Sequence, residues 1–143
     1  FSSNVYGGNL GDTTNTRSSF FGMGTVTVTG SGHTYTTAHA GFKVLLAGGV
    51  YSLYATQANG TTETASSALT TITSGDELVL IATINGTASV DYYWSKNGGA
   101  LSSATNLATN VPTGSSSVCQ FSVSNNANAN FMTLNVAGAC YEK

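Results

Sequence analysis

Charged residues are scarce in this chain. Asp, Glu, Lys and Arg make up only 7% of its 143 residues, against about 25% in an ordinary soluble domain. The formal net charge is −2 and there are four Lys or Arg residues in all, so no basic patch is available to meet a phosphate backbone. Disorder is not expected either, because 41% of the residues are hydrophobic and disordered chains lack apolar residues. The composition indicates a folded protein that does not bind nucleic acid.

Two periodic patterns are also missing. No window of about 12 residues repeats apolar side chains with the 3.6-residue period of an amphipathic helix. No apolar run approaches the ~18 to 20 residues that cross a bilayer. We therefore expect an all-β fold and no membrane insertion.

The chain has few residues suited to catalysis or metal binding. His33 and His39 share the same strand parity, but no third ligand lies near them, and we expect both to be exposed polar residues. The six acids follow no calcium-loop spacing and no Gly-x-Ser-x-Gly motif is present; they are Asp12, Glu63, Asp76, Glu77, Asp91 and Glu142. The sequence predicts no enzyme, no metal site and no cofactor.

Strand signals are abundant, and residues 78–98 carry the clearest ones. An apolar run there is followed by an Asn-Gly turn at Asn85 and by Tyr92 and Trp94 at alternate positions, which predicts a β-hairpin with a type I′ turn. Other alternating runs fall at residues 24–29, 33–37, 42–46, 51–55, 118–124 and 132–136. About nine short strands with regular turn signals predict one immunoglobulin-like or jelly-roll β-sandwich over residues 23–143. Its predicted core includes Leu80, Tyr92, Trp94, Phe121 and Leu134.

Residues 1–22 have the composition of an extended arm. They are rich in Gly, Ser, Asn and Thr, with five scattered apolar anchors: Val5, Tyr6, Leu10, Phe20 and Phe21. Such an arm either lies on its own domain or docks on a neighbouring subunit.

Residues 69–136 resemble the immunoglobulin-like modules of prokaryotic surface and filament proteins and of phage particles. The resemblance lies in a Gly-Asp opener at Gly75, the Tyr-x-Trp-x-Lys-Asn-Gly strand from Tyr92, and the Cys-x-Phe-x-Val-x-Asn strand from Cys119. It implies a cohesive or adhesive module rather than a catalyst. The sequence departs from the family at the core strand, where Ala82 or a neighbour stands in place of the partner cysteine.

The second cysteine is Cys140. If residues 118–125 and 130–136 form a hairpin, Cys119 faces the chain near Cys140, and a disulfide there would contribute roughly 3 kcal/mol. The alternative is two buried free thiols.

Several features favour export. Asn59 and Asn85 each begin an Asn-Gly-Thr sequon and are candidates for N-glycosylation. An even number of cysteines agrees with an oxidising compartment. The first residue is Phe rather than Met, which would fit removal of a signal peptide. We expect a secreted protein at the cell surface or outside the cell.

These observations predict a structural subunit of an extracellular filament of the pilus or thread type. Its partners would be copies of itself, joined by strand exchange through the N-terminal arm. The alternatives are a carbohydrate- or receptor-binding adhesin module that uses Tyr93, and a phage decoration or fibre protein. Lys43 or Lys96 beside an asparagine and a buried acid could also form an isopeptide crosslink.

Overall fold

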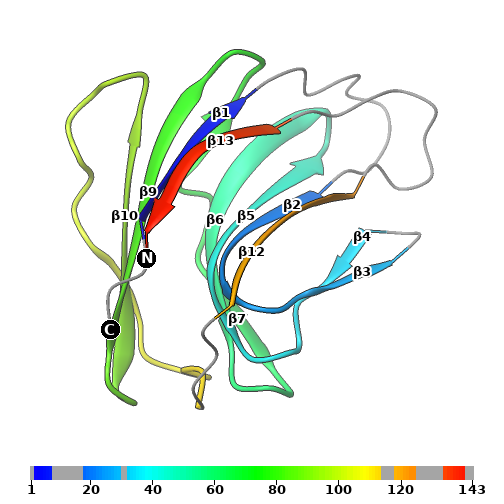
Figure 1. Ribbon diagram of the computed structural model, residues 1–143, viewed down its shortest axis with the longest axis vertical. Helices are drawn as coiled ribbons and strands as arrows, with labels where there is room; N and C mark the ends of the chain where they lie inside the picture. The colour runs from blue at the N-terminus through cyan, green and yellow to red at the C-terminus, as the bar shows by residue number, and fades with distance from the viewer. Residues whose placement is uncertain (1, 8–17, 30–31, 114–117, 125–133, 141–143) are drawn as a thin grey trace.

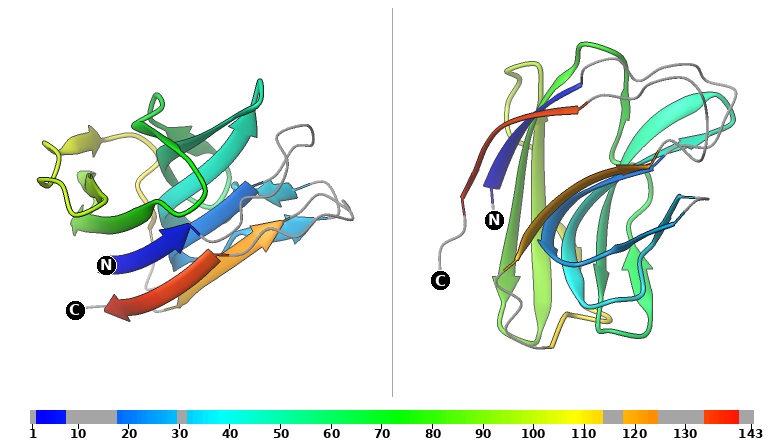
Figure 2. Two further views of the ribbon diagram at one scale, coloured as in Figure 1. Left: turned by 90° about the horizontal axis from the view of Figure 1, so that it is seen from above. Right: turned by 45° about the vertical axis from the view of Figure 1, so that its right-hand side comes forward.

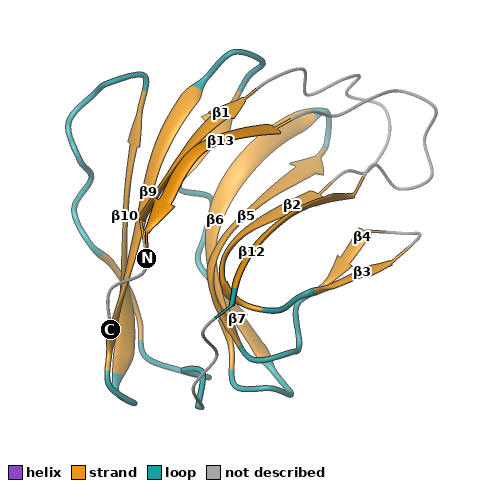
Figure 3. Cartoon of the chain, in the orientation of Figure 1, coloured by secondary structure: helices purple, strands orange, loops and turns teal. Residues whose placement is uncertain are grey.

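The computed structural model describes residues 2–7, 18–29, 32–113, 118–124 and 134–140. For residues 2–7 and 134–140 the description covers the backbone and its pairing. The described residues contain no helix, and so none that is long and apolar enough to cross a membrane. The predicted all-β fold is confirmed (Figure 3).

Thirteen strands make up the described chain. Their bounds are β1 Ser2–Gly7, β2 Ser18–Gly24, β3 Thr27–Thr29, β4 Gly32–Thr34, β5 His39–Ala47, β6 Val50–Ala58, β7 Glu63–Ala65, β8 Thr70–Ile72, β9 Glu77–Asn85, β10 Ser89–Lys96, β11 Thr105–Leu107, β12 Cys119–Ser124 and β13 Leu134–Cys140.

The strands form two antiparallel sheets that face each other, and a separate hairpin (Figure 1). Sheet A has the order β11-β10-β9-β1-β13. Sheet B has the order β12-β2-β5-β6-β7, with β8 also pairing with β6. The β3–β4 hairpin stands outside sheet B. The edge strands β12 and β13 run along the same side of the molecule (Figure 2).

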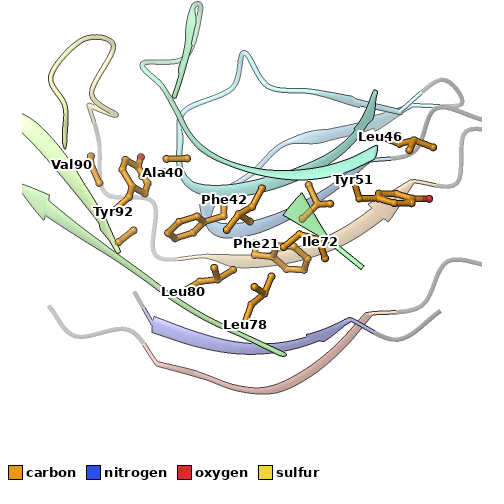
Figure 4. Close-up of a cluster of buried hydrophobic side chains, with 14 of the residues drawn as sticks. Phe21, Ala40, Phe42, Leu46, Tyr51, Ile72, Leu78, Leu80, Val90 and Tyr92 are labelled. Atoms are coloured by element: carbon orange, nitrogen blue, oxygen red, sulfur yellow. The ribbon is translucent and has the colours of Figure 1, made fainter. Parts of the chain in front are cut away.

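One hydrophobic core fills the space between the sheets (Figure 4). Phe21 and Phe42 enter it from sheet B, and Leu80 and Tyr92 from sheet A; each is at most 1% exposed. The Phe42 and Tyr92 rings meet edge to face, with centroids 5.4 Å apart. Trp94 and Phe121 are partly buried against this cluster, while the side chain of Leu134 lies outside the described part of the chain. Because both sheets contribute to one core, the described strands form a single sandwich.

The other face of sheet B is also covered. Phe20 points away from the main core and packs with Val26 and Tyr35 in a second cluster. Residues 25–29 and 32–38, called here the covering segment, lie over this face. The side-chain amide of Gln120 holds the segment in place, because it accepts from Val26 N at 2.5 Å and donates to Val26 O at 3.0 Å. The alternating run at residues 24–29 does not form one half-buried strand, since Val26 is 5% exposed whereas Val28, in β3, is 48% exposed. The chain leaves sheet B at Gly24 to form the hairpin.

The β9–β10 hairpin was predicted correctly, but its turn type was not. Asn85 pairs with Ser89 across a three-residue loop, and Ala88 N donates to Asn85 O. Gly86 has a φ of 60°, whereas Asn85 has no positive φ. A type I′ turn needs positive φ at both central residues, so this is a longer loop that needs only one glycine.

The prediction that residues 118–125 and 130–136 pair as a hairpin, on which the disulfide depended, is wrong. β12 pairs with β2 in sheet B, and β13 pairs with β1 in sheet A. Cys119 is a free thiol. The alternating pattern of these strands predicted their existence but not their sheet, because both have small and mixed side chains that fit either edge.

We predict that Gly41→Ala destabilises the sandwich by about 3 kcal/mol, because a Cβ there would meet the backbone of β2, including Gly22 Cα at 2.6 Å. Gly48→Ala is the control: nothing lies within 4 Å, and its φ of +58° predicts a cost of only about 1 kcal/mol. Urea unfolding of both variants measures the difference. Equal losses would show that β2 and β5 are not packed this closely.

Candidate functional site

Strand β1 occupies an interior position in sheet A. On one side it pairs with β9 from Ser2 opposite Ile81 to Tyr6 opposite Glu77. On the other it pairs with β13 from Ser2 opposite Cys140 to Gly7 opposite Leu134, with an irregularity between Asn4 and Val5. Within the described chain, β13 has no other strand partner. The attachment of β13 therefore depends on β1.

The arm that we predicted divides into two parts with different surroundings. Val5 and Tyr6 belong to β1, whereas Phe20 and Phe21 lie in β2 and are buried on the two faces of sheet B. Leu10 lies outside the described residues. The boundary that we placed after residue 22 falls within β2, so the segment that can act as a separate strand is Ser2–Gly7.

A buried polar cluster lies on the outer face of sheet B. Lys43, 7% exposed, places its Nζ 2.5 Å from Glu63 Oε1 and 4.6 Å from the centroid of the Tyr35 ring. Thr56 donates to the same Glu63 oxygen at 2.6 Å, and His39 Nε2 lies 3.1 Å from the Thr56 hydroxyl. The second histidine nitrogen, Nδ1, lies 2.7 Å from Thr37 O. The cluster joins β5, β6 and β7 and contacts the Tyr35 ring.

The histidines differ from the prediction. His39 is 1% exposed and His33 is partly buried, so neither is an exposed polar residue. His33 bridges three strands: Nδ1 lies 2.7 Å from Ser18 Oγ and Nε2 lies 2.9 Å from Ser122 Oγ. Burial lowers the pKa of both imidazoles, although the Thr37 carbonyl opposes the shift at His39. Among the described residues, no three His, Cys, Asp or Glu side chains gather as a metal site would require.

The Tyr35 ring packs over the cluster. It stacks on His33 with centroids 5.7 Å apart and packs against Phe20 at 6.3 Å. Burial raises the pKa of its hydroxyl, which donates to Ser19 O at 3.3 Å. The cluster thus joins the covering segment to sheet B through hydrogen bonds and ring contacts. Its lysine, Lys43, contacts Glu63 rather than the asparagine that an isopeptide crosslink would need.

The second lysine, Lys96, binds Asp76 at the end of the β9–β10 pair. Asp76 Oδ2 accepts from Thr73 N at 2.8 Å and from Lys96 Nζ at 3.3 Å, and Asp76 Oδ1 accepts from Asn97 Nδ2 at 2.7 Å. Burial opposes ionisation, but these hydrogen bonds outweigh it and lower the pKa of Asp76. Asn97, with a φ of 53°, turns the chain there. Asp76 therefore has a structural role: it holds the start of β9 to the end of β10.

Tyr93 lies on the outer face of sheet A, on the opposite side of β10 from Tyr92 and Trp94. It is partly exposed and stands opposite Ile81. Two residues away, Asp91 accepts from Asn85 Nδ2 at 2.8 Å and from Asn106 Nδ2 at 2.6 Å. These two hydrogen bonds lower the pKa of Asp91. Sequence reasoning selected Tyr93 but missed Asn106, because β11 carries no strand pattern.

Both glycosylation candidates are exposed, Asn59 in a bend after β6 and Asn85 at the last position of β9. Asn59 Oδ1 accepts from Thr61 N and Thr61 Oγ1, each at 3.0 Å, while its Nδ2 donates to Asn110 Oδ1 at 3.2 Å. Asn85 Nδ2 is engaged by Asp91. A glycan at either position would therefore have to displace or share one side-chain hydrogen bond.

Comparisons with protein-family models, with curated proteins and with solved structures found no match. The resemblance to immunoglobulin-like surface modules stays a prediction, and function has to be argued from the geometry of this chain.

We predict that Glu63→Gln destabilises the protein by about 2 kcal/mol at pH 7, because it leaves the buried ammonium of Lys43 without its counter-charge. Lys43→Met, which keeps an unbranched chain against the Tyr35 ring, should cost less, since Glu63 retains 26% side-chain exposure. Thermal and urea unfolding give the order of the two effects. The reverse order would mean that the lysine does not depend on this ion pair.

A second prediction concerns pH. The folded-state pKa values of His33 and His39 lie below their ordinary value of 6.5, so the unfolded chain binds these protons first as the pH falls. The free energy of unfolding should therefore decrease from pH 7 to pH 5. His39→Gln should weaken that dependence. Stability that rises on acidification over this range would contradict the assignment.

Proposed function

We propose that this protein is a structural subunit of an extracellular assembly, most simply a filament, in which β1 of one copy completes sheet A of the next. The observation that carries the proposal is the position of β1 between β9 and β13. A strand in this position uses both of its backbone edges, so it is held by hydrogen bonds on two sides whichever copy supplies it.

The connection to the rest of the chain suits an exchange. Residues 8–17 join β1 to β2, and ten residues can reach about 33 Å when extended. β2 is anchored independently, because it pairs with β5 and β12 and buries Phe20 and Phe21. β1 can therefore be exchanged while β2 stays in its own sandwich, which is the geometry of strand swapping between identical subunits.

The vacant position would be a strong acceptor. Without β1, β9 would present an unpaired backbone edge beside Leu78 and Leu80, which are at most 2% exposed, and β13 would lose its pairing. An open edge over an apolar core binds another strand readily. The few charges, the Thr-rich strands and the two sequons support an exported assembly. The same fold would also allow a phage decoration or fibre protein, and glycan occupancy at Asn59 and Asn85 would favour the cell-derived assembly over it.

We predict that the full chain forms filaments visible by electron microscopy, and that removal of residues 1–7 abolishes them. A synthetic peptide of residues 1–8 in excess should also block assembly of the full chain, because it occupies the acceptor position. A peptide of the same composition in scrambled order is the control. The peptide experiment keeps the test valid even if the shortened chain fails to fold.

Filaments that persist unchanged without residues 1–7 would contradict the proposal. So would a full chain that stays monomeric at every concentration and pH examined.

A further inference from the structure

The outer face of sheet A carries an aromatic ring beside an ordered set of hydrogen-bonding groups. Tyr93 and Asp91 are two residues apart on β10, so they lie on the same face about 7 Å from each other. Asp91 stands opposite Thr83 on β9 and opposite Asn106 on β11. One face of three neighbouring strands therefore presents a ring, a carboxylate, a hydroxyl and two amides.

The polar groups are held in place before any ligand arrives. Asn85 and Asn106 each hold one oxygen of the Asp91 carboxylate, and Asn85 Nδ2 also lies 3.3 Å from Ser89 Oγ. A carboxylate has about four acceptor positions, so roughly two of them stay open at Asp91. A fixed array loses little conformational entropy on binding.

The chemistry of the face restricts its ligand. An anionic ligand would meet the Asp91 charge without a neighbouring cation to offset it, since Lys96 on the same strand is engaged by Asp76. An apolar partner would bury the carboxylate without new hydrogen bonds, which is costly. A neutral sugar avoids both problems, because its hydroxyls donate to the open oxygens while its C–H face packs on an aromatic ring.

We propose that this face binds a neutral saccharide, with the Tyr93 ring against one sugar ring and with Asp91, supported by Asn85 and Asn106, accepting from the sugar hydroxyls. The site lies on β10 and its neighbours and does not depend on strand exchange by β1, so each proposal can fail without the other. It would give each subunit of an assembly one sugar contact.

The test uses the full chain made in a bacterial host, because a glycan on Asn85 would cover the site. An array of neutral and acidic oligosaccharides should show binding to neutral members only. Tyr93→Ala should weaken that binding about tenfold or more, and Tyr93→Phe should retain most of it. Asp91→Asn should also weaken it. Tyr54→Ala is the matched control, since Tyr54 is a partly exposed tyrosine on β6 of the other sheet.

Three results would overturn the proposal. The first is no binding to any neutral oligosaccharide at millimolar concentration by titration calorimetry. The second is binding confined to sialylated or sulfated members of the array. The third is an equal loss of binding in the Tyr93→Ala and Tyr54→Ala variants, provided that both melt at the temperature of the unaltered chain.

Discussion

The pairing of β1 with two strands at once is the constraint on which sheet A depends. β9 is held on its other side by β10, but within the described residues β13 reaches the sheet through β1 alone. Among the described strands, β12 is placed in a similar way, because it reaches sheet B through β2 alone, whereas pairs such as β5–β6 and β9–β10 join strands that follow each other in the sequence. The pairing of β1 thus closes sheet A. The backbone pairs that β1 makes with β9 and β13 would be the same whether β1 comes from its own chain or from another copy.

Both faces of sheet B are covered, one by the main core and the other by the covering segment. Gly22, which pairs with Gly41, leaves room for the Phe20 ring, and this ring meets His39 edge to face with centroids 5.2 Å apart. Covering this face buries Lys43 and His39 and leaves His33 partly buried, and each of these groups has a hydrogen-bond partner there. The charge-poor composition agrees with this arrangement, since few charged side chains need to be accommodated away from water.

The strands that the sequence predicted correctly are those with alternating apolar residues. The strands around Phe42, Leu53, Leu80 and Tyr92 have apolar residues at every second position, and the structure has strands there. The sequence predicted an N-terminal arm that could act as a strand, but it did not divide the arm into β1 and β2, and it did not predict β11, because the Gly, Ser, Asn and Thr residues of these segments are typical of loops. Nor could it assign sheets: Cys119 and Cys140 were joined through a hairpin between β12 and β13 that does not exist. Pairing between distant segments leaves little trace in local periodicity.

The same limit applies to the candidate sites. Tyr93 could be placed on the outer face from parity alone, while Asn106 reaches Asp91 only through the β10–β11 pairing. Lys43 could have been singled out as the one charge within the apolar run Phe42–Leu46, a pattern typical of a buried, paired lysine. Its partner Glu63 lies twenty positions later, in a segment without a distinctive signal.

The most direct test of the central claim asks which copy supplies β1 in the assembled material. Asn4 and Val79 face each other across the β1–β9 pair, and directly opposite residues of antiparallel strands can be joined by a disulfide. In a background that carries Cys119→Ser and Cys140→Ser, and so has no native thiol, oxidation of the Asn4→Cys, Val79→Cys variant after assembly should give a ladder of covalent multimers. The control pair Thr83→Cys, Asp91→Cys, which lies within the β9–β10 hairpin, should give monomers. If the first pair also gives only monomers, β1 stays in its own sandwich and the proposed joint between subunits is wrong.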